Sequence, residues 1–530
     1  MTSISRKGIL VLALLTVLAL LAAPAVAQDM EESEFVFAHG GPIRTLDAPV
    51  TWFISTHWLA NLLYDCLIWR TVDGSGYVGQ AAESWENVDA TTWRFNLRPG
   101  ITFHNGEALD AAAVKWNIDR VRTREDFMVQ PQWLDVAEVI VVDDVTVDIK
   151  TVAPTPYFEF IVSFNGCELL PPGYIEEVGE EQFARAPVGS GPYVLSEFSE
   201  SDRYVFTAWD DYWGGRPDID RVIYQVIPEQ SAQVAALLAG QVDMVANVPS
   251  AEVPGLEMAE GIVLTSETAA VMQHLYLRVE TETGNMDSTY PDYQPATLDA
   301  NVRHAISAAL DRDLLAEVHG SALPRTGRIC PHFPEGGGDS FNSAEGVAAA
   351  YNPDRARELL AEAGYADGGP TVYLDSPTVG RAGSEKEVAE VVSVMLEEVG
   401  FNVELTVLDP SAYGEQISSG GNNRDIMMVS LGCSVPLVPL FYQCNWIQAN
   451  YNVCNEDFDA VAQAILTEMD PAARLELWGQ WWEYWFDTMQ TVTLFESQAI
   501  IAYSDEFDFT PRKDGWYTFR ENLKLAGDDM

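Results

Sequence analysis

The chain has 530 residues, 47% of them hydrophobic and 11% aromatic, so it is long and apolar enough to bury more than one core. Its 80 acidic residues outnumber its 30 lysines and arginines and give a formal net charge of −50. Because nucleic acid is bound through basic surfaces, we expect no nucleic-acid partner. The acidic surface suits a saline habitat or reflects lineage bias, and the sequence does not decide between them.

The N-terminal segment has the features of a secretory signal peptide. Arg6 and Lys7 precede an apolar run at 9–21, and the small-residue motif A-V-A follows at 25–27. This order predicts export and cleavage after residue 27, since the apolar run is shorter than the roughly 20 residues of a membrane span. No cysteine lies near the predicted cleavage point. We therefore expect a periplasmic or otherwise extracytoplasmic protein that is not a lipoprotein.

Strand and helix signals alternate along the chain, which predicts an α/β fold. The strands expected in the first half are the segments 35–38, 93–97, 101–103 and a pair within 139–149. The turn at 98–100 predicts that its two flanking strands form a hairpin. Asp110 is the expected N-cap of a helix over 111–121.

The second half carries clearer helix signals. The expected helices are 302–310, 353–363 and 385–399, followed by a strand at 401–405. Asp299 or Asn301 can cap the first helix, Pro353 stands at the start of the second, and Gly364 ends it. Near the C-terminus, tryptophans at 478, 481, 482 and 485 fall on one helical face, which predicts core packing rather than a ligand cage.

The sequence contains no motif that predicts catalysis. The run GSGYVG at 74–79 matches a dinucleotide motif, but it looks like a turn and opens no long helix. The sequence has no P-loop, nucleophile elbow or H-E-x-x-H, and its seven histidines are scattered. We therefore expect no cofactor, no metal and no enzymatic activity. A secreted hydrolase with an unrecognised carboxylate pair remains the distant alternative.

All six cysteines follow the predicted cleavage point, which permits three disulfides in an oxidising compartment. Six cysteines allow about 15 pairings, and the residues alone do not choose among them. No C-x-x-C or Cys/His cluster has the spacing of a zinc site.

Short runs stand in a fixed order along almost the whole mature chain. They are Leu46-Asp47, LYDCL at 63–67, QAAESW at 80–85, WRFNLRPGITFHNG at 93–106, PVGSGPY at 187–193, YWGG at 212–215, GQVD at 240–243, VRHAI at 302–306 and the helix of 356–364. In content and order they resemble the family 5 extracytoplasmic solute-binding proteins, which include oligopeptide-, dipeptide- and nickel-binding proteins. The run at 93–106 is the most specific.

The resemblance implies a two-lobed, periplasmic-binding-protein-like α/β fold of type II, cluster C, with an extra domain inserted in the first lobe. After the signal peptide 1–27, lobe 1 would comprise 28–58, 187–275 and 495–530, the inserted domain 59–186 and lobe 2 276–494. It implies a monomer that captures a peptide or similar amphiphilic solute between the lobes and delivers it to an ABC permease and ATPase. Oligosaccharides or other metabolites are the alternative ligands, and a binding module without a permease is an alternative role.

The resemblance also implies which residues line the ligand site. They are Trp52, Phe53, Arg381, Ser434, Val435 and Trp446. Val435 stands where peptide-binding relatives place an aspartate for the ligand's α-amino group, and a valine cannot neutralise an ammonium. This substitution predicts a changed preference among peptides.

Two disulfides are implied by bridges in similar proteins. Cys444–Cys454 resembles a bridge of the dipeptide-binding relatives, and Cys330–Cys433 resembles one of the oligopeptide-binding relatives. Cys66 and Cys167, both within the implied inserted domain, would then form the third pair.

Overall fold

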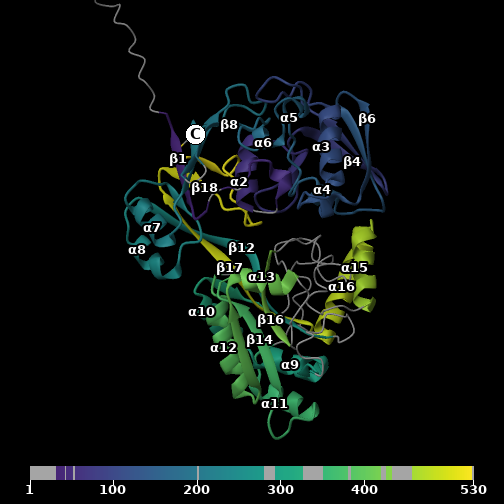
Figure 1. The fold of residues 1–530 in the computed structure, drawn as a ribbon, viewed down its shortest axis with the longest axis vertical. Coiled ribbons are helices and arrows are strands. Elements are labelled where there is room, and N and C mark those ends of the chain that lie inside the picture. Colours follow the sequence, from purple (N-terminus) through teal and green to yellow (C-terminus); the bar gives the residue numbers. More distant parts are fainter. Residues whose placement is uncertain are drawn as a thin grey trace, which may run out of the picture.

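The computed structural model describes residues 32–41, 43, 45–51, 54–199, 202–279, 293–325, 350–379, 383–418, 425–432 and 456–527. Figure 1 shows two lobes joined by the long strands β12 (Ile262–Leu277) and β17 (Thr491–Ser504). We call the described residues up to 261 and from 505 onward the N-terminal lobe, and those of 293–489 the C-terminal lobe. Helices and strands alternate in both, as the sequence predicts.

One mixed sheet of eleven strands runs through both lobes in the order β15-β14-β16-β12-β17-β11-β1-β10-β9-β8, with β13 beside β17. Apart from β12 and β17, its strands are β1 (Glu34–His39), β8 (Tyr193–Ser199), β9 (Arg203–Ala208), β10 (Arg221–Val226), β11 (Met244–Val245), β13 (Ala322–Pro324), β14 (Thr371–Pro377), β15 (Asn402–Leu408) and β16 (Ile426–Gly432). Strand β1 is therefore central to the N-terminal lobe, as its buried Phe35 and Phe37 require.

A second, four-stranded antiparallel sheet lies in the N-terminal lobe. Its order is β4 (Ala82–Asp89), β5 (Thr92–Leu97), β7 (Thr146–Thr151) and β6 (Val136–Asp143). The strand pair predicted within 139–149 is confirmed as β6 and β7. The hairpin predicted around 98–100 is wrong, because β5 pairs with β4 and β7 while Thr102 makes only an isolated bridge to Ala108.

The described helices of the N-terminal lobe are α2 (Ile54–Leu63), α3 (Ala111–Thr123), α4 (Phe158–Ile161), α5 (Pro172–Val178), α6 (Glu180–Phe183), α7 (Gln230–Leu238) and α8 (Val253–Leu256). Those of the C-terminal lobe are α9 (Ala300–Ala309), α10 (Arg312–His319), α11 (Pro353–Glu362), α12 (Glu385–Glu398), α13 (Pro410–Ser418), α15 (Glu456–Thr467) and α16 (Pro471–Thr488). None of these helices combines the length and apolar character that a membrane span requires.

Short elements complete the described fold. The 3-10 turns are η1 (Ala48–Val50), η2 (Gln130–Trp133), η3 (Ser250–Glu252) and η4 (Ala296–Leu298). The two small ribbons are β2 (Ile68–Arg70) with β3 (Tyr77–Gly79), and β18 (Phe507–Phe509) with β19 (Leu523–Leu525). The dinucleotide-like run at 74–79 lies in the β2–β3 ribbon, so it opens no helix.

Local capping chemistry sets several helix starts where the sequence predicts them. The carboxylate of Asp110 accepts the N–H of Ala113, and that of Asp299 accepts the N–H of Asn301. Of the two candidate caps for α9, the structure therefore uses Asp299. An N-cap side chain supplies the acceptor that the first turn of a helix lacks.

The tryptophan stripe of α16 is buried, as predicted. Trp478, Trp481, Trp482 and Trp485 are at most 5% exposed. Phe458 of α15 stacks on Trp481 with ring centroids 4.8 Å apart. Aromatic packing of this kind fixes α15 against α16.

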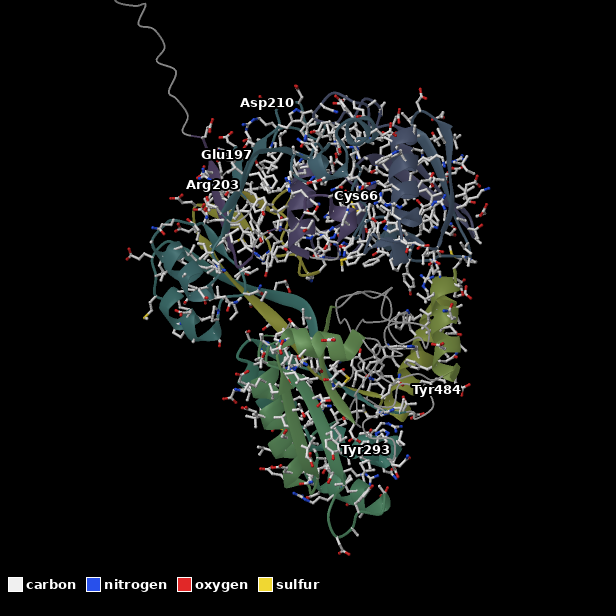
Figure 2. All side chains as sticks on the ribbon, viewed as in Figure 1. Cys66, Glu197, Arg203, Asp210, Tyr293 and Tyr484 are labelled. Atoms are coloured by element: carbon white, nitrogen blue, oxygen red, sulfur yellow. A yellow bond between two sulfur atoms is a disulfide. The ribbon has the colours of Figure 1, made fainter. Side chains whose placement is uncertain are left out.

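Cys66 and Cys167 form a disulfide, which confirms that pairing (Figure 2). It joins the chain just after α2 to the loop before α5, 101 residues away. The other predicted bridges, Cys330–Cys433 and Cys444–Cys454, lie outside the described residues.

The glycines of the run at 187–193 permit a close backbone approach. A Cβ atom on Gly189 would lie 1.8 Å from the carbonyl oxygen of Leu63, and one on Gly191 would lie 2.6 Å from that of Leu62. Neither glycine has a positive φ, so the left-handed backbone conformation that often requires glycine is not the reason for them. Steric exclusion of any side chain by the end of α2 is the reason.

Candidate functional site

The parallel strands of the C-terminal lobe direct their carboxyl ends at the N-terminal lobe. Strand β16 runs antiparallel to β12, and its last residue, Gly432, lies opposite Val271. Val271 follows the irregularity in β12 at which this strand leaves one lobe for the other. Strand β14 is parallel to β16, so its carboxyl end points the same way.

The N-terminal lobe has the complementary arrangement. Strand β11 is antiparallel to β17, with Met244 opposite Tyr503 and Val245 opposite Ala502. It therefore also runs toward the point where β12 and β17 pass from one lobe to the other. Strands β1 and β10 are parallel to β11 and to each other. The carboxyl ends of parallel strands from both lobes therefore face one another (Figure 1). In α/β sheets such ends are the usual place for ligands.

Buried polar side chains gather at the end of the C-terminal lobe that faces the other lobe. Glu385, at the start of α12, is 1% exposed and accepts the N–H of Gly383 at 3.0 Å. The Ser430 hydroxyl lies 2.5 Å from Oε1 of Glu385 and 2.9 Å from Oε1 of Gln273. This network ties β12, β16 and α12 together, so it fixes the shape of that surface.

An ion pair lies where β12 and β17 pass between the lobes. Arg325, one residue beyond β13, donates from Nε to Oε2 of Glu496 at 2.9 Å. Glu496 on β17 is fully buried, whereas the Arg325 side chain is 27% exposed. The next residue of β17, Ser497, has its hydroxyl 3.3 Å from Nε2 of His319. The arginine is thus the solvent-facing member of the pair and is suited to orient an anionic or carbonyl group.

At the N-terminal lobe's end, His39 terminates β1. Its ring lies edge-on to Trp58 and 5.1 Å from the ring of Tyr224. Burial lowers the pKa of His39, and the Gly41 N–H donates to its Nδ1 at 3.2 Å. This end of the lobe is therefore lined by aromatic rings and by one uncharged imidazole.

All six predicted ligand-site residues lie outside the described residues: Trp52, Phe53, Arg381, Ser434, Val435 and Trp446. The structure therefore neither brings them together nor separates them. Described neighbours flank three of these positions at the facing ends, namely Val379 and Gly383 around Arg381, and Gly432 before the 434–435 pair. The carbonyl of Thr51, before Trp52, is held 2.8 Å from Nε2 of buried His57.

Sequence reasoning missed the polar residues that do meet here: Gln273, Arg325, Glu385, Ser430 and Glu496. They come from segments far apart in the chain, and no local motif marks them. One available signal was an acidic residue directly at the start of a predicted helix, as for Glu385.

The family-like runs form structural junctions elsewhere. Fully buried Asp65 accepts from Arg520 at 2.5 Å, from Trp213 Nε1 at 3.0 Å and from Tyr212 at 3.3 Å. Three distant segments are joined at this one carboxylate. Asp65, Tyr212 and Trp213 of these runs are therefore explained by folding.

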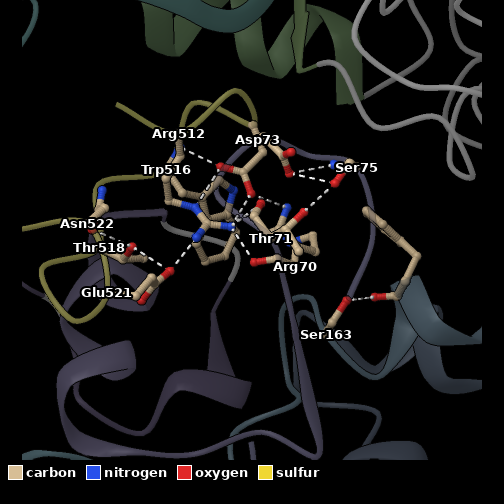
Figure 3. Close-up of polar contacts among 12 residues, drawn as sticks. Arg70, Thr71, Asp73, Ser75, Ser163, Arg512, Trp516, Thr518, Glu521 and Asn522 are labelled. Carbon is tan, nitrogen blue, oxygen red and sulfur yellow. Dashed lines mark hydrogen bonds and ion pairs between the residues drawn. The ribbon is translucent and has the colours of Figure 1, made fainter. Parts of the chain in front are cut away.

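A second buried network anchors the C-terminal segment on β2 (Figure 3). Arg512 donates to the carbonyl of Arg70 at 3.0 Å and pairs with Asp514 and Glu521. The Arg70 guanidinium lies 4.6 Å from the centre of the Trp516 ring. The paired charges of this network hold the Asp514 pKa below its ordinary value through Arg70 and Arg512, although burial opposes this. Within the described ranges, no three His, Cys, Asp or Glu side chains are grouped as metal ligands.

Comparisons with known proteins agree with this architecture. A family model described as bacterial extracellular solute-binding proteins, family 5 Middle, matches residues 76–451. The glutathione-binding protein GsiB of Salmonella paratyphi A is 25% identical over 432 residues, which cover 78% of this chain and 80% of that protein.

Two solved structures share the two-lobed fold. The ABC transporter substrate binding protein CtaP from Listeria monocytogenes has a TM-score of 0.80 at 19% identity, covering 93% of this chain and 99% of that one. A dipeptide binding protein from a Pseudoalteromonas species, in complex with Met-Leu, has a TM-score of 0.74 at 19% identity, covering 93% of this chain and 100% of that one.

Proposed function

Because this chain belongs to family 5 of the bacterial extracellular solute-binding proteins, we propose that it is the substrate-binding subunit of an ABC importer. The observation that carries the proposal is the arrangement of the two lobes, in which carboxyl ends of parallel strands face each other across the strands β12 and β17. A solute held there is enclosed when the lobes approach, and no chemical step is required.

The proposed ligand is a peptide or a similar small amphiphilic solute. Similar proteins bear names that state binding of glutathione and of a dipeptide, both of which carry peptide bonds and charged ends. The facing ends offer an aromatic group around His39 and the partly exposed side chain of Arg325, which suit apolar side chains and a carboxylate. Val435 favours solutes without a free α-amino group among these.

The proposed location and membrane partners follow from the predicted export signal and from the family. The signal peptide 1–27 would be removed, and the monomeric protein would work in the periplasm or another extracytoplasmic space, without a lipid anchor. Its closed form would dock on a membrane permease driven by an ATPase. The domain division proposed for this cycle is 28–58, 187–275 and 495–530 for lobe 1, 59–186 for the inserted domain and 276–494 for lobe 2.

Thermal-shift screening with glutathione, dipeptides, N-acetylated peptides and short oligosaccharides tests the proposal. A solute at 100 times its Kd adds about 2.7 kcal/mol to the free energy of unfolding, which raises the Tm by a measurable amount. We expect at least one stabilising solute, recovered chemically unchanged. Turnover of a stabilising solute would instead support the hydrolase alternative.

A further inference from the structure

Tyr157 of the N-terminal lobe contacts two residues of α16 in the C-terminal lobe. Its hydroxyl accepts a hydrogen bond from Nε1 of Trp478 at 3.1 Å. The guanidinium carbon of Arg474, one turn earlier on α16, lies 5.1 Å from the centre of the Tyr157 ring. One tyrosine thus joins segments 321 residues apart in sequence.

The partners on α16 are firmly held. Trp478 is 1% exposed and belongs to the tryptophan stripe, and Arg474 is 5% exposed. Arg474 also donates from Nη1 to the carbonyl of Glu468 at 2.6 Å. Tyr157 itself precedes α4 and packs against the same aromatic core as α15 and α16. Both sides of the contact are therefore rigid, and neither is a flexible surface side chain.

This contact lies away from the other junction of the lobes. The backbone passes between the lobes at β12 and β17, where Gly320 also approaches Ser250 so closely that a Cβ atom would lie 2.7 Å from its hydroxyl. Figure 1 shows α4 and the α15–α16 pair together at the opposite edge of the molecule. Within the described ranges, the contacts of Tyr157 with Trp478 and Arg474 are made by side chains, so they can break while the strands stay continuous.

We propose that Tyr157, Trp478 and Arg474 form a latch that holds the two lobes closed at the edge opposite β12 and β17. A hydrogen bond and a cation–π contact together shift an equilibrium by about ten-fold or more. A shift of this size matters, because the open and closed forms of a protein that switches between them differ by only a few kcal/mol in free energy. The latch tunes how often the protein opens, independently of which solute it binds.

Small-angle scattering of solute-free protein tests the latch. Tyr157→Ala removes both contacts, whereas Tyr157→Phe keeps the ring beneath Arg474 and removes only the hydroxyl. We expect a larger radius of gyration for Tyr157→Ala and an intermediate one for Tyr157→Phe. Tyr174→Phe is the matched control, because the Tyr174 hydroxyl donates to the carbonyl of Ala186 within the N-terminal lobe.

Equal radii for wild type and both Tyr157 variants, with all proteins folded by circular dichroism, would overturn the latch. An equal expansion in Tyr174→Phe would overturn it too, since the effect would then come from the lobe and not from the contact. Trp478→Phe removes the donor of the same hydrogen bond, so its effect on the radius should be smaller in the Tyr157→Phe background than in the wild-type background.

The inference assumes the lobe motion of the proposed function, but its test needs no solute. Calorimetric titration with glutathione then separates the two ideas. If wild type binds it and the radii of wild type and Tyr157→Phe are equal, the latch fails while solute binding stands. If neither protein binds glutathione or any member of the peptide panel, yet the radii differ as expected, the latch stands and the proposed ligand class fails.

Discussion

Arg120 of α3 holds both carboxylate oxygens of Asp47, with Nη1 3.1 Å from Oδ1 and Nη2 2.6 Å from Oδ2. The two side chains are 6% and 3% exposed. The pair ties α3, which packs on the four-stranded sheet, to the segment that leads into α2. The run Leu46-Asp47 is thereby explained as an anchor, with Tyr64 donating to the carbonyl of Leu46 at 2.8 Å.

Removing one member of this pair is expected to destabilise the fold strongly. Arg120→Met leaves Asp47 buried and without its main partner, which costs about 3–5 kcal/mol. Urea unfolding measures the free energy. Arg185→Met, which removes a 69% exposed side chain paired with Glu181, is the control and should change it by less than about 1 kcal/mol. A small effect of Arg120→Met would contradict the anchor.

Stability should fall between pH 6.5 and 5 because of His274. This side chain on β12 is fully buried, its Nδ1 is 3.2 Å from the Thr493 hydroxyl, and burial lowers its pKa to about 3. The unfolded chain takes up a proton below about pH 6.5 and the folded one does not. The free energy of unfolding therefore falls by about 2 kcal/mol between pH 6.5 and pH 5. Unfolding titrations of His274→Met should show a smaller loss over this interval. An equal loss in the variant would refute the assignment.

Asp243 gives the opposite pH dependence of stability to His274. Burial raises its pKa to about 6, while its Oδ2 accepts the Val36 N–H at 2.7 Å. A raised pKa means that the folded state loses stability as pH rises from about 4 to 6. Asp243→Asn keeps an acceptor and removes the charge. After discounting for its partial exposure, we expect a gain of about 1 kcal/mol at pH 7 and none below pH 4.

The control for that change is Asp508→Asn, at an exposed position of β18. It removes the same formal charge without a buried carboxylate, so it should leave the free energy of unfolding nearly unchanged. A similar gain in both variants would mean that net charge, and not burial of Asp243, is responsible.

Salt should stabilise the protein. A net charge of −50 repels itself in the compact state, and Figure 2 shows oxygen-tipped side chains over the surface of both lobes. Raising NaCl from 0.1 to 1 M shortens the screening length from about 10 to 3 Å. We expect a Tm higher by several degrees. A lower Tm in salt would contradict a repulsive acidic surface.

Restoring a carboxylate at Val435 should change the choice of peptide. A charge-assisted hydrogen bond is worth about 1.5–3 kcal/mol, so Val435→Asp should strengthen free-amine peptides by about one to two orders of magnitude over N-acetylated ones. Calorimetry with paired peptides measures the ratio. If wild type already binds the free peptide tightly and acetylation abolishes binding, another acid supplies the anchor.

Local chemistry could be predicted from the sequence, and distant pairing could not. The cap at Asp110 and the buried face of α16 depend on residues a few positions apart, and both predictions are confirmed. The hairpin over 93–103 is wrong because Phe103 donates to the carbonyl of Glu107 while β5 finds its partners in β4 and β7.

The candidate site shows the same limit. Gln273, Ser430 and Glu385 meet only because β12, β16 and α12 are brought together by the sheet. Nothing in the spacing of these residues along the chain marks them as neighbours. Likewise, Tyr157 and Trp478 look like ordinary core aromatics in the sequence, and only the fold places them at a contact between lobes.

Native mass spectrometry of the exported protein tests the central claim most directly. If two lobes enclose a solute without altering it, a fraction of the purified protein should carry one extra small molecule. That molecule should dissociate intact on denaturation, and the refolded protein should bind it again when it is added back. Protein that stays at the mass of the bare chain, both as purified and after incubation with millimolar peptide mixtures, would contradict solute capture.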